Sequence, residues 1–219
     1  MSARISIVVP VRDGERYLAA ALGSLLGQER APDEVVVVDD GSVDGSARVA
    51  ASVPGVVVVR REAQGPAAAR NAGVARATGE LIGFLDADDA VTPRALLAQE
   101  AGLAGADVAV GLARNVADDR PGPPDADLGR DAVRSYALGT LLVRRAVLDR
   151  VGPFDPALIG GEGVDWVARA RRAGIRFAEH DEVVLLRRDH GANFSASARA
   201  RAGYLQLARA AILRQRAET

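Results

Sequence analysis

The chain of 219 residues contains no cysteine and no lysine, and only 4% of its residues are aromatic. The absence of cysteine excludes a disulfide scaffold, a thiolate metal site and a cysteine nucleophile. The absence of lysine excludes a P-loop lysine and a Schiff-base lysine, because both need an ε-amine. All 28 basic residues are therefore arginines.

Long apolar runs are also absent, since none approaches the roughly twenty residues that cross a bilayer. The first residues lack the basic, apolar and cleavable order of a secretion signal. We therefore expect a cytoplasmic protein. A net charge of −1 argues against general binding of nucleic acid. The composition, 48% hydrophobic and 26% charged, is that of one folded domain over residues 1–219.

Apolar strands alternate with one-sided helices along the chain. The patterns predict strands over 5–11, 35–38, 56–59, 81–85, 107–111 and 183–186 and helices over 15–26, 46–52, 66–77, 94–103 and 164–173. They also predict a strand entering a helix over 140–151, a loop over 117–130 and a helix over 196–216. This order indicates an α/β fold, a doubly wound, mostly parallel sheet with helices on both faces.

Two acidic motifs follow predicted strands. Asp86 and Asp88 stand two residues apart, so an extended backbone would point both carboxylates to one side, as a divalent cation requires. The alternative is a solvated acidic turn. Asp39, Asp40 and Gly41 close an earlier strand, where a carboxylate can accept hydrogen bonds from a base or ribose and glycine permits close approach. An ordinary turn is the competing interpretation.

Four ordered motifs together resemble the family 2 glycosyltransferases of GT-A fold. They are Ile7-Val8-Val9-Pro10-Val11 with Glu15, Val37-Val38-Asp39-Asp40-Gly41-Ser42 with Asp44, Ala69-Arg70-Asn71-Ala72-Gly73, and Asp86-Ala87-Asp88-Asp89. The likeness is strong in the first half of the chain and looser beyond it. One departure is Arg12-Asp13 where the family commonly has Tyr-Asn, which leaves nucleobase contacts there open.

The resemblance implies a division of labour along the chain. Residues 1–111 would form a half that binds the nucleotide sugar, 112–195 the acceptor side and 196–217 a C-terminal helix. Mn²⁺ or Mg²⁺ would be the cofactor. The nucleotide-sugar contacts would come from Pro10, Val11, Glu15, Asp39, Asp40, Gly41, Arg70, Asp86 and Ala87, and the metal ligands would be Asp86, Asp88 and His190.

The second half must supply a base. Glu162 and Asp165 are three residues apart, so a helix would place both on one face. Similar enzymes carry an adjacent Glu-Asp pair, but here Gly163 follows Glu162. We therefore prefer Asp165 as base, with Glu162 next. The competing interpretation pairs Asp165 with Arg169 in a surface salt bridge.

The expected reaction is inverting transfer of a sugar, with UDP-sugar as the commonest donor, to an acceptor hydroxyl. The acceptor, whether a glycan, a lipid-linked molecule or a natural product, is not specified by the sequence. One alternative is a nucleotidyltransferase that makes the sugar nucleotide, and another is a silent nucleotide-binding module, which Gly163 favours. The arginine-rich segment 199–216 allows peripheral membrane contact at the inner face or a homodimer.

Overall fold

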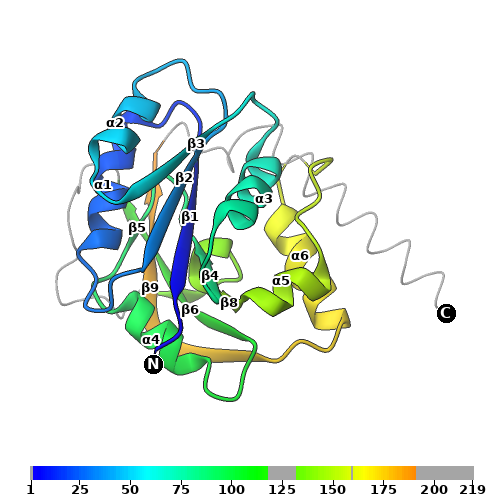
Figure 1. Cartoon of the computed structure of the whole chain (residues 1–219). Coiled ribbons are helices and arrows are strands. Elements are labelled where there is room, and N and C mark those ends of the chain that lie inside the picture. The colour runs from blue at the N-terminus through cyan, green and yellow to red at the C-terminus, as the bar shows by residue number, and fades with distance from the viewer. Residues whose placement is uncertain (1, 118–131, 159, 191–219) are drawn as a thin grey trace.

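A nine-stranded sheet forms the centre of the structure, a computed structural model that describes residues 2–117, 132–158 and 160–190 (Figure 1). The strands are β1 (Ile5–Val11), β2 (Glu34–Asp39), β3 (Val56–Arg60), β4 (Leu81–Phe84), β5 (Ala90–Val91), β6 (Val108–Ala117), β7 (Val133–Arg134), β8 (Leu141–Arg144) and β9 (Phe177–Asp189). The helices are α1 (Glu15–Leu26), α2 (Ser46–Ser52), α3 (Pro66–Arg76), α4 (Ala95–Gly102), α5 (Arg145–Val151) and α6 (Glu162–Arg172), with a 3₁₀ turn, η1 (Leu138–Thr140).

The strand order is β3-β2-β1-β4-β8-β6-β9-β5, and β7 pairs with β6 outside this path. The first four strands of this order are parallel. β8 runs antiparallel to both β4 and β6, so that β6 and β9 again share the direction of β1. Most paired residues belong to the parallel ladders, which confirms the predicted fold class.

Each face of the sheet is covered by its own helices and its own apolar cluster. Ile7 and Val9 of β1 pack in the cluster beneath α1, α2 and α4, whereas Val8 packs in the cluster beneath α3, α5 and α6. Figure 1 shows these two helical layers on opposite sides of the strands. The alternation follows from the two-residue period of a strand, and it explains why β1 reads as a continuous apolar run.

Helix α3 lies unusually close to the sheet. A Cβ atom at Gly73 would lie 2.2 Å from a methyl carbon of Val8, so only glycine permits this approach. Asn71 exchanges two hydrogen bonds with the backbone of Phe154, at 2.8 and 2.9 Å. These bonds join α3 to the turn that precedes α6. The Arg-Asn-Ala-Gly segment therefore fixes where the neighbouring Arg70 side chain stands.

The predicted bounds agree best with the structure for helices, whose pattern is local in the sequence. The helices predicted over 15–26 and 46–52 coincide with α1 and α2. The strand predictions over 107–111 and 183–186 found only the first part of β6 and the middle of β9. The two strands continue in parallel pairing to Ala117 and Asp189. The remaining parts carry exposed polar residues, which no buried-strand pattern identifies. The predicted helix over 196–216 and most of the predicted loop over 117–130 lie outside the described residues.

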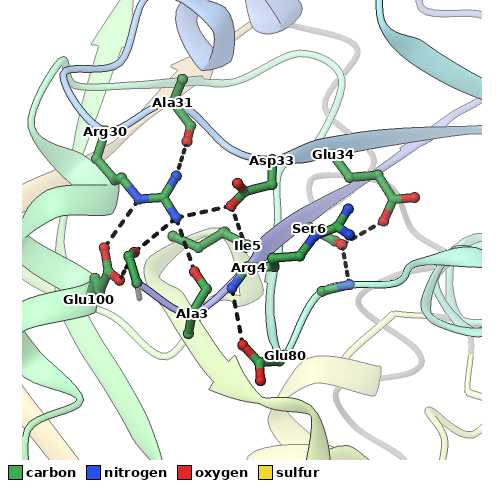
Figure 2. A network of polar contacts seen from close by, with 12 residues as sticks. Ala3, Arg4, Ile5, Ser6, Arg30, Ala31, Asp33, Glu34, Glu80 and Glu100 are labelled. Atoms are coloured by element: carbon green, nitrogen blue, oxygen red, sulfur yellow. Dashed lines mark hydrogen bonds and ion pairs between the residues drawn. The ribbon is translucent and has the colours of Figure 1, made fainter.

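The amino-terminal edge of the sheet, called the amino edge below, is closed by ion pairs (Figure 2). The Arg30 guanidinium donates to Asp33 at 2.9 Å and to Glu100 at 3.3 Å. The Ile5 amide donates to the same Asp33 oxygen at 2.8 Å. This backbone bond is the main reason that the pKa of Asp33 lies below its usual range, and Arg30 adds to the effect.

Two further carboxylates of the amino edge are satisfied in the same way. Burial alone would raise the pKa of Glu34, but hydrogen bonds from Ser6 and Thr78 outweigh burial and lower it. The side-chain hydrogen bonds from Arg176 lower the pKa of Asp107. The acidic groups that begin the strands are thus stabilised in their charged form.

Candidate active site

The strand order reverses between β1 and β4, and the candidate site lies beyond the carboxyl ends of these strands. The chain builds β2 and β3 on one side of β1 and then returns to place β4 on the other side. Open α/β sheets bind ligands at such a switch point. Because β8 is antiparallel to β4, the η1 turn that precedes it belongs to the same edge, called the carboxyl edge below.

A buried arginine joins the two halves of the chain at this edge. Arg70 of α3 is only 6% exposed, and its guanidinium contacts both Asp86, after β4, and Glu162, the first residue of α6. We call these three residues the Arg70 bridge. The sequence predicts Asp86 on the donor side and Glu162 on the acceptor side, and the bridge places both against one cation.

Charge balance explains why this arginine can be buried. Burial alone would lower the pKa of Arg70, but the charges of Asp86 and Glu162 outweigh it and raise the pKa. The guanidinium therefore stays protonated. Its Nε atom is buried and has no hydrogen-bond partner within the described part of the chain. An arginine Nε–H without a partner can still donate a hydrogen bond to a ligand oxygen.

The residues after β4 form a turn rather than an extended strand. β4 ends at Phe84, and the Asp89 amide donates to the Asp86 carbonyl oxygen at 3.1 Å. The prediction of an extended backbone through Asp86 and Asp88 is therefore wrong. The turn divides the two carboxylates between partners: Asp86 contacts Arg70, whereas Asp88 contacts His190.

Asp88 and His190 form a close pair, as the prediction of a shared metal site requires. The Nε2 atom of His190 lies 3.1 Å from Oδ2 of Asp88. The imidazole is held from its face by Tyr17 of α1, with ring centroids 4.8 Å apart and 23° between the planes. The last residue before the undescribed C-terminal segment is thus tied both to α1 and to the turn after β4.

Negative charge accumulates in this turn. Burial, and then the nearby charge of Asp86, raises the pKa of Asp88 despite its hydrogen bond with His190. Burial raises the pKa of Asp89 further, and the charges of Asp86 and Asp88 add to it, although the Arg188 amide donates to Asp89 at 2.9 Å. A cation bound here would relieve this repulsion.

The donor set fits a divalent cation only in part. Among residues 2–117, 132–158 and 160–190, no group of three His, Asp or Glu side chains is arranged to hold a metal ion. The separation of 3.1 Å between Asp88 and His190 suits two adjacent ligands of an octahedral ion, whose bonds are about 2.1 Å long. Of the three predicted ligands, the structure therefore brings Asp88 and His190 together, while Asp86 is engaged by Arg70.

Asp39 and Asp40, two of the predicted nucleotide residues, are buried at the end of β2 and hold neighbouring loops. Asp39 is 1% exposed and accepts hydrogen bonds from the Ser42 amide and Arg60. Asp40 is 3% exposed and accepts from two backbone amides, the closer being Gly65 at 2.7 Å. Gly41 has a φ of +79°, a conformation that favours glycine. Pro10 and Ala87 are half-buried, and Val11 is buried.

Two loops that follow β1 and β2 are joined by reciprocal hydrogen bonds, and we call residues 13–15 and 42–46 the loop clamp. Glu15, which the resemblance places near a ribose, accepts from the Gly45 amide at 2.8 Å and pairs with Arg48. Asp13 accepts from the Val43 amide at 2.8 Å. The amides of residues 13–15 are in turn satisfied by side chains of the second loop. They are therefore not available to bind phosphate.

The first-choice base, Asp165, lies in a different environment from Glu162. Its carboxylate pairs with Arg169 at 2.8 Å, and Arg169 also donates to the carbonyl oxygens of Val151 and Pro153, both at 2.8 Å. This is the salt bridge named as the competing interpretation. Asp165 therefore holds the first turns of α6 through Arg169, and of the two carboxylates Glu162 is the one that belongs to the Arg70 bridge.

Packing accounts for the glycine that replaces the second acid of the pair. A Cβ atom at Gly163 would lie 2.9 Å from a side-chain carbon of Leu138 in η1. A side chain at this position would push α6 away from η1 and with it Glu162. Gly163 therefore supports the position of Glu162 and is not by itself a sign of a silent site.

Sequence reasoning assigned no role to three residues that complete the site. Tyr17 stacks on His190, Arg188 donates to the Asp88 carbonyl at 3.1 Å, and Asp89 adds the third acidic group. The run of acids at 86–89 could have indicated Asp89. No local sequence pattern distinguishes Tyr17, because its partner, His190, is distant in the sequence.

Comparison with known proteins gives the same family as these motifs. Residues 6–154 match the family described as glycosyl transferase family 2. The chain is 35% identical over 200 residues to the succinoglycan biosynthesis protein ExoU of Rhizobium meliloti, covering 79% of this chain and 58% of that protein. It is 31% identical over 208 residues to the pre-mycofactocin glycosyltransferase of Mycobacterium tuberculosis, covering 85% and 43%.

Solved structures share the fold. A crystal structure of Staphylococcus aureus TarS 1–349 in complex with UDP-GlcNAc has a TM-score of 0.73 and 25% identity, covering 89% of this chain and 61% of that one. The mannosyltransferase PcManGT of Pyrobaculum calidifontis, solved with GDP-Man and Mn²⁺, has a TM-score of 0.67 at 20% identity, covering 90% and 60%. The chain thus spans 43% to 61% of the length of these proteins. The family match over most of its length shows that the chain belongs to glycosyl transferase family 2.

Proposed function

We propose that the chain is a metal-dependent, inverting glycosyltransferase that moves a sugar from a nucleotide diphosphate donor to an acceptor hydroxyl. The observation that carries the proposal is the Arg70 bridge, which joins an acidic turn on the donor side to a buried glutamate on the acceptor side. A UDP-sugar is the simplest donor, because TarS was crystallised with UDP and with UDP-GlcNAc.

The donor diphosphate would lie against the turn after β4. Asp88 and His190 would hold the cation, with Arg70 and Asp86 beside them. Mn²⁺ fits this pair better than Mg²⁺ because imidazole is a poor ligand for Mg²⁺. When bound, the cation would neutralise charge that develops on the departing diphosphate. Tyr17 would keep the imidazole edge directed at the cation.

Glu162 would act as the general base. Its carboxylate would accept the proton of the acceptor hydroxyl while the acceptor oxygen bonds to the anomeric carbon. The bond from that carbon to the diphosphate would break, and the diphosphate would leave with the electron pair on the opposite face. One displacement inverts the anomeric carbon, so no covalent intermediate on the chain is needed. Asp165 remains the second candidate: both carboxylates pair with an arginine, but the arginine of Glu162 also contacts Asp86 on the donor side.

The alternative of a nucleotidyltransferase has less support. Such enzymes bind phosphates with free amides of a glycine-rich first loop, and in this chain the amides of residues 13–15 donate to Ser42, Ser46 and Asp44. The acceptor stays open between a glycan, a lipid-linked molecule and a natural product. A peripheral membrane contact or a homodimer through 199–216 would rest on residues outside the described ranges. Within those ranges, every helix is too short or too polar to traverse a bilayer.

A panel of nucleotide sugars with Mn²⁺ tests the proposal by binding and slow hydrolysis. We expect one donor to bind and be hydrolysed, EDTA to abolish the hydrolysis, and Asp88→Asn to weaken donor-dependent Mn²⁺ binding by at least about tenfold. Asp107→Asn at the amino edge is the matched control and should bind as the unmodified chain does. Failure of every donor to bind would refute the function, and unchanged Mn²⁺ binding in Asp88→Asn would refute the metal assignment.

A further inference from the structure

The loop clamp is a closed set of reciprocal hydrogen bonds between two helix starts. Asp44 accepts from the Glu15 amide at 2.9 Å at the start of α1, and Glu15 accepts from the Gly45 amide at 2.8 Å at the start of α2. Each carboxylate therefore caps the helix that follows the other loop. A carboxylate at a helix start also interacts favourably with the helix dipole.

Two backbone features show that the clamp demands its own residue types. Asp13 has a φ of +52°, a left-handed conformation that Asp and Asn adopt more readily than other side chains. A Cβ atom at Gly45 would lie 2.2 Å from a carboxylate oxygen of Glu15, so a side chain at 45 would displace the Glu15 carboxylate. The strained turn at Asp13 is held because its carboxylate accepts from the Val43 amide.

The clamp is continuous with both sides of the candidate site. Ser42, which accepts from the Asp13 amide, donates its own amide to the buried Asp39 at 2.9 Å. On the other side, Tyr17 lies two residues beyond Glu15 in the first turn of α1 and stacks on His190. The clamp therefore lies next to both the loop above Asp39 and the helix turn that carries Tyr17.

We propose that the loop clamp is a positioning device for the donor, with Asp13 and Asp44 as its positioning residues. The inference rests on the proposed function and adds a source for donor affinity. Because side chains already order both loops, a nucleotide sugar would bind without the entropic cost of ordering them. Neither residue takes part in the chemical step, so loss of the clamp should weaken donor binding and leave the turnover of bound donor unchanged.

The test compares Asp13→Ala, Asp44→Ala and Asp13→Asn. The first two remove clamp acceptors, whereas Asp13→Asn keeps an acceptor oxygen and a residue that tolerates positive φ. We expect the two alanine variants to raise the KM and the UDP–Mn²⁺ dissociation constant about tenfold, the effect of losing one to two hydrogen bonds. Their kcat should stay within about twofold of the unmodified value. Asp13→Asn should restore most of the affinity.

Asp107→Ala serves as the control for a purely structural effect, because it removes a similar carboxylate that accepts a backbone amide at the amino edge. It should lower the melting temperature without raising the KM. Amide hydrogen exchange at Val43 and Gly45 reports whether each variant opens the clamp. Unchanged dissociation constants in variants whose amides exchange quickly would overturn the inference while the proposed function stands. If the unmodified chain binds no nucleotide sugar, both the proposed function and this inference are refuted.

Discussion

Both edges of the sheet carry acidic groups, but the turn after β4 differs from the amino edge in how its carboxylates are satisfied. At the amino edge, Asp33, Glu34 and Asp107 have lowered pKa values because backbone amides, hydroxyls or guanidinium groups satisfy them. At the carboxyl edge, burial and mutual repulsion raise the pKa values of Asp88 and Asp89. The first arrangement stabilises the fold, whereas the second leaves negative charge for a ligand to neutralise.

This contrast teaches where to look for function in a fold that is charged at both ends. An ion pair alone is not informative, because Arg30 at one edge and Arg70 at the other each contact two carboxylates. The two sites differ in how the carboxylates beside the arginine are otherwise satisfied. Asp33 of the Arg30 network also accepts a backbone amide, whereas Asp86 of the Arg70 bridge stands next to two further acids with raised pKa values.

The largest expected effect comes from exchanging glutamate for glutamine at each edge. Glu162→Gln should lower kcat by about 10²–10⁴, because an amide cannot take up the proton of the acceptor hydroxyl. Glu34→Gln should leave kcat unchanged, since Glu34 contacts Ser6, Thr78 and Arg76 at the amino edge. Steady-state kinetics with the donor identified above measures both.

Asp165→Asn completes this comparison at the carboxyl edge. It removes the charge that pairs with Arg169 but leaves the Arg70 bridge intact, so its effect should appear in stability and not in kcat. A collapse of kcat in Asp165→Asn together with near-normal turnover in Glu162→Gln would reverse the assignment of the base. Circular dichroism of each variant confirms that it is folded before its rate is compared.

How much of this could be predicted from sequence depends on how local each feature is. Helix α1 shows its apolar stripe within twelve residues, so its bounds were predicted correctly. The partners of Arg70 lie 16 and 92 residues away, and only the folded chain brings them together. The preference for Asp165 over Glu162 as base stays a prediction, because the local pattern carries no such long-range information. Helical spacing treats them alike, and their different long-range partners separate them.

The acidic turn shows a second limit. Alternation along a strand predicts where side chains point only while the strand continues, and β4 ends at Phe84. The bond from the Asp89 amide to the Asp86 carbonyl then sets the positions of the carboxylates. The metal site that Asp88 and His190 would share stays a prediction from the family resemblance, and the structure places the two side chains 3.1 Å apart.

A smaller effect is expected on the free energy of unfolding, which should change in opposite directions for variants at the two edges. Asp33→Asn should lower the free energy of unfolding by about 1–2 kcal/mol, since it weakens charged hydrogen bonds to Ile5 and Arg30 at a partly exposed site. Asp88→Asn should raise it by up to about 1 kcal/mol in metal-free protein, because it removes a repelled charge. Urea unfolding at pH 7 with EDTA gives both values, and a loss of stability in Asp88→Asn would contradict the contrast.

The smallest effect is the dependence of stability on pH in metal-free protein. Raised pKa values at Asp88 and Asp89 mean that the folded chain binds protons more readily than the unfolded chain. Stability should therefore rise slightly as pH falls through these pKa values toward about 4. Lowered pKa values at Asp33 and Asp107 have the opposite sign. Their contribution is complete above about 4 and is lost as pH falls through the folded values.

These opposing terms predict a shallow maximum of stability on the acidic side of neutrality, with each group contributing about 1 kcal/mol or less. Urea unfolding from pH 7 to pH 3 measures the profile. Asp88→Asn combined with Asp89→Asn should remove the rise, whereas Asp33→Asn should make the fall below pH 4 shallower. A profile that declines steadily from pH 7 in the unmodified chain would mean that the carboxyl edge holds no excess charge. The electrostatic reason for placing a cation there would then be lost.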